Sequence, residues 1–179
     1  MNKDSTVIDL EKVVIKFAGD SGDGMQLTGS QFTETSALLG NDLATFPDFP
    51  AEIRAPLGTV AGVSGFQVHI GNTEINTPGD VADVLVAMNP AALKANKNWI
   101  KKGGTIIINS DSFAKKDLDK AGYENNPLED GSFSGFNIVE APIANLTQET
   151  LKDSGYIGCL IDPWRELKNS CKINLKANL

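Results

Sequence analysis

The sequence contains few of the residues that build metal and redox sites. Of its 179 residues, two are cysteine and one is histidine. Two thiols cannot hold an iron–sulfur cluster, which needs about four cysteine ligands, and Cys159 and Cys171 lack the close spacing of a zinc site. His69 alone offers little for a histidine-based metal site or a catalytic triad. We therefore expect neither a metal site nor a catalytic residue in this chain.

Positive charge and long apolar runs are also scarce. The chain has 16 Lys and Arg against 23 Asp and Glu, and its net charge of −7 argues against a nucleic-acid partner. No apolar run approaches the roughly 20 residues that span a membrane, and residues 1–11 lack the apolar segment of a signal peptide. We expect a cytoplasmic protein with no membrane partner, whose cysteines are reduced.

The length suits one domain, because a chain of this size can bury roughly 70% of its unfolded surface without staples. We predict a single domain over residues 1–179, with a polar N-terminal arm at 1–11 and a C-terminal tail at about 160–179.

Strand and helix signals alternate along most of the chain. Apolar runs rich in β-branched residues predict strands at 13–17, 84–88, 105–109 and 137–143. Helices are predicted at 25–39, from Asn89-Pro90 to about 102, at 113–121, and from 145 or 147 to about 153. This alternation predicts parallel crossovers around a central sheet, and so a three-layer α/β/α sandwich that is Rossmann-like in its first unit.

Residues 41–80 have a different pattern, because proline and glycine interrupt them repeatedly. Between these breaks, residues 64–70 alternate apolar and polar side chains, as a half-buried strand does. Gly71-Asn72 is a turn signal, and residues 73–76 could return as a paired strand. We therefore predict an extended loop and an inserted antiparallel β-hairpin, which makes the sheet mixed.

A glycine-rich loop, residues 19–24, separates the first predicted strand from the first predicted helix. Such a loop can present backbone N–H groups and the positive end of a helix to an anion. The spacing does not match the dinucleotide fingerprint or the P-loop, and Asp20 and Asp23 add negative charge. A tight turn that packs the helix on the sheet explains the same glycines. From spacing alone, both interpretations remain open.

Two further candidates come from elsewhere in the chain. Asn89 follows a predicted strand, and ligands of open α/β sheets bind at the carboxyl ends of strands. Arg54 ends a rigid aromatic segment, residues 46–54, and could bind an anion. Alternatively, Arg54 forms a solvated ion pair with Glu52, which contributes little stability.

The longer sequence pattern resembles a known family. The run Phe-Ala-Gly-Asp-Ser-Gly-Asp-Gly at 17–24 and the run Thr-Phe-Pro-Asp-Phe-Pro-Ala-Glu-Ile-Arg at 45–54 resemble the gamma domain of 2-oxoacid:ferredoxin (acceptor) oxidoreductases. The likeness continues through residues 62–67, 75–80 and 84–89, and it is greatest to the 2-oxoglutarate branch. The Gly-Asp-Gly at 22–24 also resembles the start of a thiamine-diphosphate motif, but Asn41 is too close and Asn72 too far to complete it.

The resemblance implies a reaction in which a 2-oxoacid, coenzyme A and ferredoxin give acyl-CoA, carbon dioxide and reduced ferredoxin. It implies that thiamine diphosphate, magnesium and iron–sulfur clusters belong to alpha, beta and ferredoxin-like partner subunits, and that this chain is inactive alone. It also implies a role in coenzyme A binding and subunit assembly. The residues expected to contact coenzyme A are Gly19, Asp20, Ser21, Gly22, Asp23, Gly24, Arg54 and Asn89.

The sequence leaves two alternative hypotheses for the function of this chain. The chain could be a stand-alone NAD- or FAD-binding domain, although its loop has the wrong glycine order for that class. It could also be a purely structural assembly module that binds no ligand.

Overall fold

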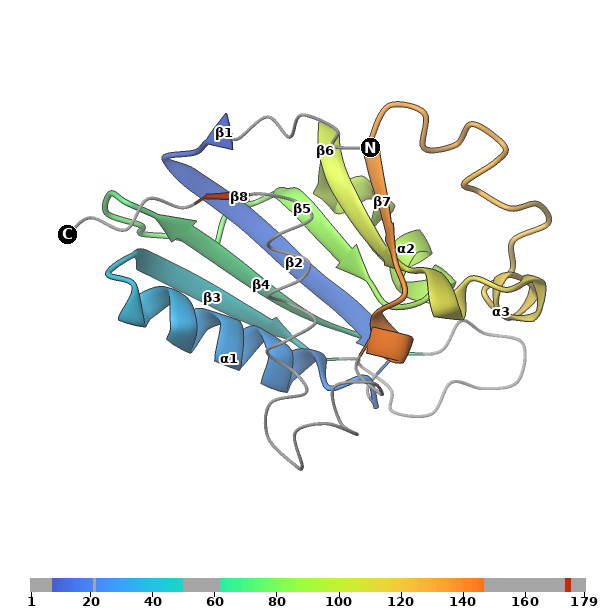
Figure 1. Cartoon of the computed structure of the whole chain (residues 1–179), viewed down its shortest axis with the longest axis horizontal. Helices are drawn as coiled ribbons and strands as arrows, with labels where there is room; N and C mark the ends of the chain where they lie inside the picture. Colours follow the sequence, from blue (N-terminus) through green and yellow to red (C-terminus); the bar gives the residue numbers. More distant parts are fainter. Residues whose placement is uncertain (1–7, 21, 50–61, 147–172, 175–179) are drawn as a thin grey trace.

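A six-stranded mixed β-sheet forms the centre of the protein in the computed structural model, which describes residues 8–20, 22–49, 62–146 and 173–174 (Figure 1). The strand order is β3-β4-β2-β5-β6-β7. Their bounds are β2 (Lys12–Asp20), β3 (Asp42–Asp48), β4 (Val63–Gly71), β5 (Ala82–Ala87), β6 (Ile100–Asn109) and β7 (Asn137–Ala141). A separate parallel pair joins β1 (Ile8–Asp9) to β8 (Ile173–Asn174).

The sheet has a parallel half and an antiparallel half. Strands β2, β5, β6 and β7 run parallel to one another, whereas β4 runs antiparallel to both β2 and β3. The predicted α/β fold with a mixed sheet is therefore confirmed. Because β2, β5 and β6 are parallel, their carboxyl ends meet at one rim, where ligands of such sheets bind.

The predicted partner of the antiparallel strand was wrong. Residues 73–76 form no strand, and β4 pairs instead with β3, which the sequence analysis had treated as loop. Pro47 lies within β3, and it is tolerated there because β3 is an edge strand of the sheet. The backbone N–H of Ile75 donates to Asp42 Oδ2 at 2.6 Å, which ties the 73–76 segment to the start of β3.

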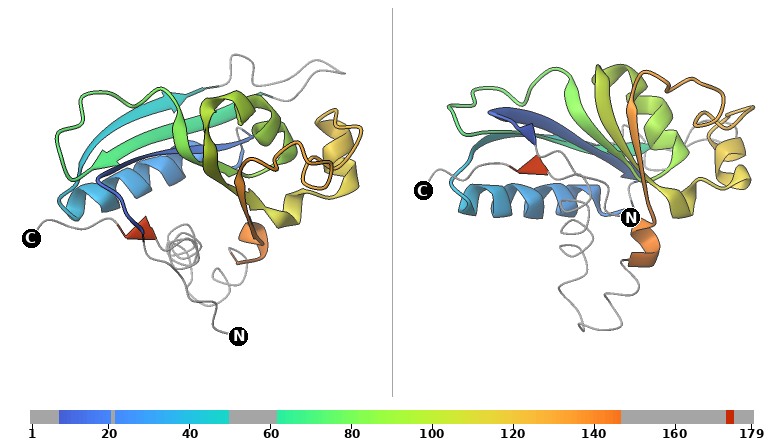
Figure 2. Two further views of the ribbon diagram at one scale, coloured as in Figure 1. Left: turned by 90° about the horizontal axis from the view of Figure 1, so that it is seen from above. Right: turned by 45° about the horizontal axis from the view of Figure 1, so that its top comes forward.

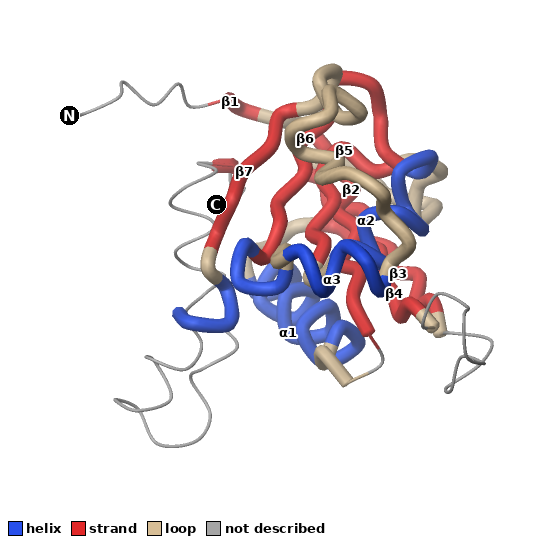
Figure 3. The backbone as a smooth tube through the Cα atoms, turned by 90° about the vertical axis from the view of Figure 1, so that its right-hand side faces the viewer, coloured by secondary structure: helices blue, strands red, loops and turns tan. Residues whose placement is uncertain are grey.

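Helices cover both faces of the sheet. The ring of Phe17 on β2 meets that of Phe32 on α1 (Met25–Leu38) edge-on, with 5.4 Å between centroids. The next residue, Ala18, points to the other face and packs in a buried cluster with Leu93 of α2 (Pro90–Asn96). The three layers follow from this alternation and can be seen in Figure 2, and Figure 3 shows them from the β7 side.

The starts of the helices follow local signals, but one end does not. Asn89 caps α2 by accepting a hydrogen bond from the N–H of Ala92 at 2.8 Å, with Pro90 at the first helical position, as predicted. The predicted extension of this helix to residue 102 was wrong. A 3₁₀ turn, η1 (Lys97–Trp99), ends it, and Lys101 lies on β6, where its ammonium pairs with Asp83.

The remaining described helical segments are short. They are a 3₁₀ turn, η2 (Ser110–Ser112), then α3 (Lys115–Lys120), and one turn at 143–146. In the described part of the chain, every helix falls short of the length and apolar character needed to cross a membrane.

Candidate functional site at the rim of the sheet

The glycine-rich loop forms a turn that its own polar groups close. The N–H of Asp23 donates to the carbonyl of Asp20 at 3.0 Å, and the N–H of Asp20 donates to Asp23 Oδ2 at 2.8 Å. Gly24 follows with φ of 71°, a left-handed conformation that glycine adopts without strain, and α1 begins at Met25. Residues 19 and 20 belong to β2, so the turn is shorter than the sequence predicted.

Asn89 joins this turn to the neighbouring strand. Its Nδ2 donates to Asp20 Oδ1 at 3.0 Å and lies 3.5 Å from Asp23 Oδ2, while its Oδ1 caps α2. One side chain thereby connects the carboxyl ends of β2 and β5. The structure brings Asp20, Asp23 and Asn89 together, whereas Ser21 and Arg54 lie outside the described residues.

Asp23 has an unusual environment for a carboxylate. Burial raises the pKa of its carboxyl group above the ordinary value of 3.8, and the nearby charge of Asp20 adds to this. The hydrogen bonds from the Asp20 N–H and from Asn89 act in the opposite direction. The net effect is that Asp23 keeps its proton to a higher pH in the folded protein than a solvent-exposed aspartate does.

A hollow of about 260 Å³ opens at this rim. The hollow is lined by Asp20, Asp23 and Asn89, and also by Asp117 and Lys120 of α3. The two α3 residues were not among the predicted site residues. The sequence of α3 does not indicate this position, because α3 is held against α2 by residues distant in sequence, where Lys94 Nζ donates to the carbonyl of Ala121 at 2.9 Å. Three carboxylates against one ammonium make the hollow acidic, so it does not suit a diphosphate group.

The opposite side of the loop is open. An ideal Cβ added to Gly22 or Gly24 would meet no atom of the described residues within 4 Å. Gly24 caps α1 without a side-chain hydrogen bond, and the first turn of α1 carries no acidic residue. The first backbone N–H groups of a helix have no partner within that helix, and they attract negative charge. This side of the loop is therefore the part that suits an anionic group.

Thiamine diphosphate does not fit the Gly-Asp-Gly at 22–24. The carboxylate of Asp23 turns back onto the N–H of Asp20 and toward Asn89, so it is not free to ligate a metal. Within the described residues, no group of three or more His, Cys, Asp or Glu side chains is placed to hold a metal ion.

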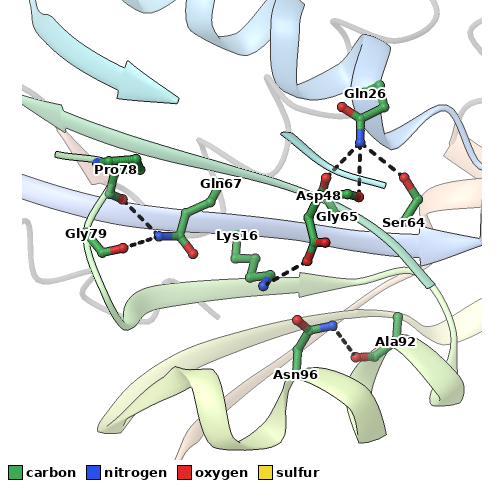
Figure 4. A network of polar contacts seen from close by, with 10 residues as sticks. All are labelled: Lys16, Gln26, Asp48, Ser64, Gly65, Gln67, Pro78, Gly79, Ala92 and Asn96. Atoms are coloured by element: carbon green, nitrogen blue, oxygen red, sulfur yellow. Dashed lines mark hydrogen bonds and ion pairs between the residues drawn. The ribbon is translucent and has the colours of Figure 1, made fainter. Parts of the chain in front are cut away.

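A second set of polar residues, absent from the sequence predictions, holds the antiparallel half in place (Figure 4). Gln26 Nε2 donates to the carbonyl of Gly65 at 2.8 Å and lies 3.2 Å from Ser64 Oγ, which links α1 to β4. His69 Nδ1 lies 2.7 Å from the carbonyl oxygen of Thr77, in keeping with a structural role.

Comparison with known proteins identifies relatives of this chain. A family model described as pyruvate ferredoxin/flavodoxin oxidoreductase matches residues 14–161. The 2-oxoglutarate oxidoreductase subunit KorA of Mycobacterium tuberculosis is 59% identical over 138 residues, which are 77% of this chain and 21% of that protein. The chain thus spans about a fifth of the length of this relative.

Solved structures share the fold at lower identity. The 2-oxoglutarate:ferredoxin oxidoreductase of Magnetococcus marinus, solved with 2-oxoglutarate, coenzyme A and succinyl-CoA bound, has a TM-score of 0.60 at 22% identity, covering 90% of this chain and 28% of that one. The gamma subunit of a keto/oxoacid ferredoxin oxidoreductase from Geobacter sulfurreducens has a TM-score of 0.55 at 18% identity, covering 78% and 66%. Both show the same fold as this protein.

Proposed function

Because this chain belongs to the pyruvate ferredoxin/flavodoxin oxidoreductase family, we propose that it is the gamma component of a 2-oxoglutarate:ferredoxin oxidoreductase. The observation that carries this proposal is the 59% identity to the M. tuberculosis subunit over 138 residues. In the reaction, 2-oxoglutarate, coenzyme A and two oxidised ferredoxins give succinyl-CoA, carbon dioxide, two reduced ferredoxins and a proton. The stand-alone dinucleotide-binding alternative is not favoured by these relatives.

The chemistry is divided between this chain and its companions. Thiamine diphosphate and iron–sulfur clusters on companion polypeptides supply the decarboxylation and the electron transfer. The residues of this chain bind and orient coenzyme A and hold the assembly together. The alternative that the chain is purely structural makes a different prediction for coenzyme A, and the experiment below separates the two.

Coenzyme A approaches the open side of the glycine-rich loop in this proposal. Its phosphates meet the backbone at Gly22 and Gly24 and the start of α1, where no atom in the described part of the chain lies within 4 Å of a Cβ added to either glycine. Asp20 and Asp23 do not contact phosphate directly. With Asn89, they hold the loop in the conformation that presents these N–H groups. Ser21 and Arg54 remain proposed contacts on the strength of the resemblance alone.

Reconstitution with companion subunits tests the proposal. We expect ferredoxin reduction by 2-oxoglutarate to require this chain, and full activity without it would overturn the assignment. In the assembled enzyme, Gly22→Val should raise the KM for coenzyme A by roughly tenfold, about 1.4 kcal/mol of lost binding, with the KM for 2-oxoglutarate unchanged.

A matched variant controls for the effect of valine itself. Gly135 also has no atom of the described chain within 4 Å of an added Cβ, but it lies in the loop before β7, so Gly135→Val should leave both KM values unchanged. If Gly22→Val assembles normally and its KM for coenzyme A is unchanged, the chain is a structural module and the loop is only a turn.

A further inference from the structure

A groove of about 470 Å³ crosses the α2 side of the sheet over β2, β3 and β4, apart from the glycine-rich loop. Phe46, Gln67 and Lys16 are direct neighbours on β3, β4 and β2 and form its floor. One wall is formed by the end of α2 together with Trp99 of η1. In the described part of the chain, α2 is the helix that packs on this face, and the groove lies beside it.

The polar groups of the floor are fixed before anything binds (Figure 4). Gln67 Nε2 donates to the carbonyls of Pro78 at 2.9 Å and Gly79 at 2.6 Å. Asp48 is opposite Gly65 in the register of β3 and β4, and its carboxylate pairs with the ammonium of Lys16. A prearranged surface loses less conformational entropy when a partner binds.

Lys16 is the unusual residue of this groove. Its side chain is only 9% exposed, and its ammonium lies 3.5 Å from Asp48 Oδ2 and 5.7 Å from the centre of the Trp99 ring. Among the described residues, Asp48 supplies the one carboxylate oxygen within salt-bridge distance of this ammonium. A lysine carries three N–H donors, and a buried donor without an acceptor is costly. Beside its ion pair with Asp48, this ammonium can therefore donate a hydrogen bond to an incoming oxygen atom.

Two aromatic side chains that line the groove are unusually exposed. Phe46 on its floor and Trp99 on its wall are each 53% exposed. Large aromatic side chains usually bury most of their surface. A group of them around one hollow is typical of a protein interface, in which aromatic residues are enriched.

The charges of the groove limit what can fill it. Asp48 and Asp80 both line it against the single ammonium of Lys16, so a phosphate or other anion is disfavoured. An uncharged oxygen can accept a hydrogen bond from Lys16, and an apolar side chain next to it can pack on the exposed aromatic rings. A polypeptide offers both, because its backbone carbonyl groups lie beside its side chains. This chain matches 21% of the M. tuberculosis relative, so 79% of that protein lies outside the match.

We propose that this groove is the docking site of a companion polypeptide of the oxidoreductase. The companion places an apolar side chain against Phe46 and Trp99 and offers an uncharged oxygen to Lys16. This inference rests on the proposed function, but it concerns a face of the sheet distinct from the coenzyme A loop.

Binding of purified companion subunits to the immobilised full chain tests the site. Trp99→Ala and Phe46→Ala should each raise the Kd at least about tenfold, as truncation of a central aromatic contact does. Lys16→Met, which keeps the length but removes the donors, should raise it about fivefold or more. Leu38→Ala is the matched control, because Leu38 is 85% exposed on α1, on the opposite face, and its Kd should change less than twofold.

The outcomes separate this inference from the proposed function. Wild-type binding together with unchanged Kd values for Trp99→Ala and Phe46→Ala overturns the docking site alone. Absence of wild-type binding overturns both proposals. Amide hydrogen exchange of the wild-type chain gives a result that needs no variant. Companion binding should slow exchange in Asp42–Asp48 and in residues 90–99 but not in α1, and protection elsewhere only would overturn the site.

Discussion

The carboxylate of Asp23 accepts a hydrogen bond from the backbone N–H of Asp20, with 2.8 Å between Oδ2 and N. The loop therefore fills one of its own anion-binding positions with a side chain. To accept a hydrogen bond from the same N–H, an external phosphate would have to displace the carboxylate of Asp23. In the proposal above, an anionic ligand therefore approaches the Gly22 side of the loop, and Asp23 is a residue with measurable effects on stability.

Asp23→Asn should remove a pH dependence of stability. The folded state raises the pKa of Asp23 above 3.8, so folding is favoured at low pH and loses this contribution as pH rises through the raised pKa. Asparagine keeps an oxygen that can accept from the Asp20 N–H but does not titrate. The free energy of unfolding of the variant, relative to wild type, should therefore increase as pH rises from about 4 toward 7. Urea unfolding at several pH values measures this, and a pH-independent difference would contradict it.

Asn89 has two functions that two substitutions can separate. Asn89→Ala removes the cap of α2 and the hydrogen bond to Asp20, and it should lower the free energy of unfolding by about 1–2 kcal/mol. Asn89→Asp retains a good capping group but places a third carboxylate beside Asp20 and Asp23. It should be destabilising at pH 7 and much less so near pH 4. Equal stability of Asn89→Asp and wild type at pH 7 would show that only the cap matters.

Gly19 lies where the loop packs most tightly on the sheet. A Cβ at this position would be 2.7 Å from Asp23 Oδ2 and 3.1 Å from Met88 Cβ. Gly19→Ala should therefore lower the free energy of unfolding by about 1–3 kcal/mol through overpacking. Gly22→Ala, three residues away in the same loop, meets no atom within 4 Å among the residues that the structure describes and should change it by less than about 0.5 kcal/mol. Urea midpoints of the two variants give the comparison, and equal midpoints would refute the close packing.

Local signals were sufficient for much of the fold and for part of the site. Asn89 and Pro90 predicted the start of α2 because both act on backbone groups within one turn. The glycine-rich loop was also predicted from a local signal, the cluster of glycines between a strand and a helix. Its contact with Asn89 spans 69 positions, and the sequence indicated only that both segments end strands at one rim.

Long-range pairing was the part that the sequence did not reveal. Pro47 suggested a loop, and only the position of β3 at the sheet edge makes a strand there possible. Lys16 sits in an apolar strand, but its burial depends on Trp99 and Asp48, which are distant in sequence. A residue of this kind becomes visible only when the strand order is known.

Gln26 and Gln31 offer a final prediction, because the same substitution should lower the stability of the protein at one position of α1 and not at the other. Gln26 Nε2 donates to the carbonyl of Gly65 at 2.8 Å and lies 3.3 Å from the carbonyl oxygen of Asp48. Gln26→Met keeps the length of the side chain but leaves these carbonyls without this donor, and it should lower the free energy of unfolding by about 1–3 kcal/mol.

Gln31 is the matched control for this change. Its Oε1 is buried without a hydrogen-bond partner among the described residues. Gln31→Met removes that unpaired acceptor, so the free energy of unfolding should stay the same or rise by up to about 1 kcal/mol. Thermal and urea unfolding of both variants measure the contrast. Equal losses of stability in the two variants would mean that methionine is poorly accommodated along α1, and that the link from Gln26 to β4 contributes little.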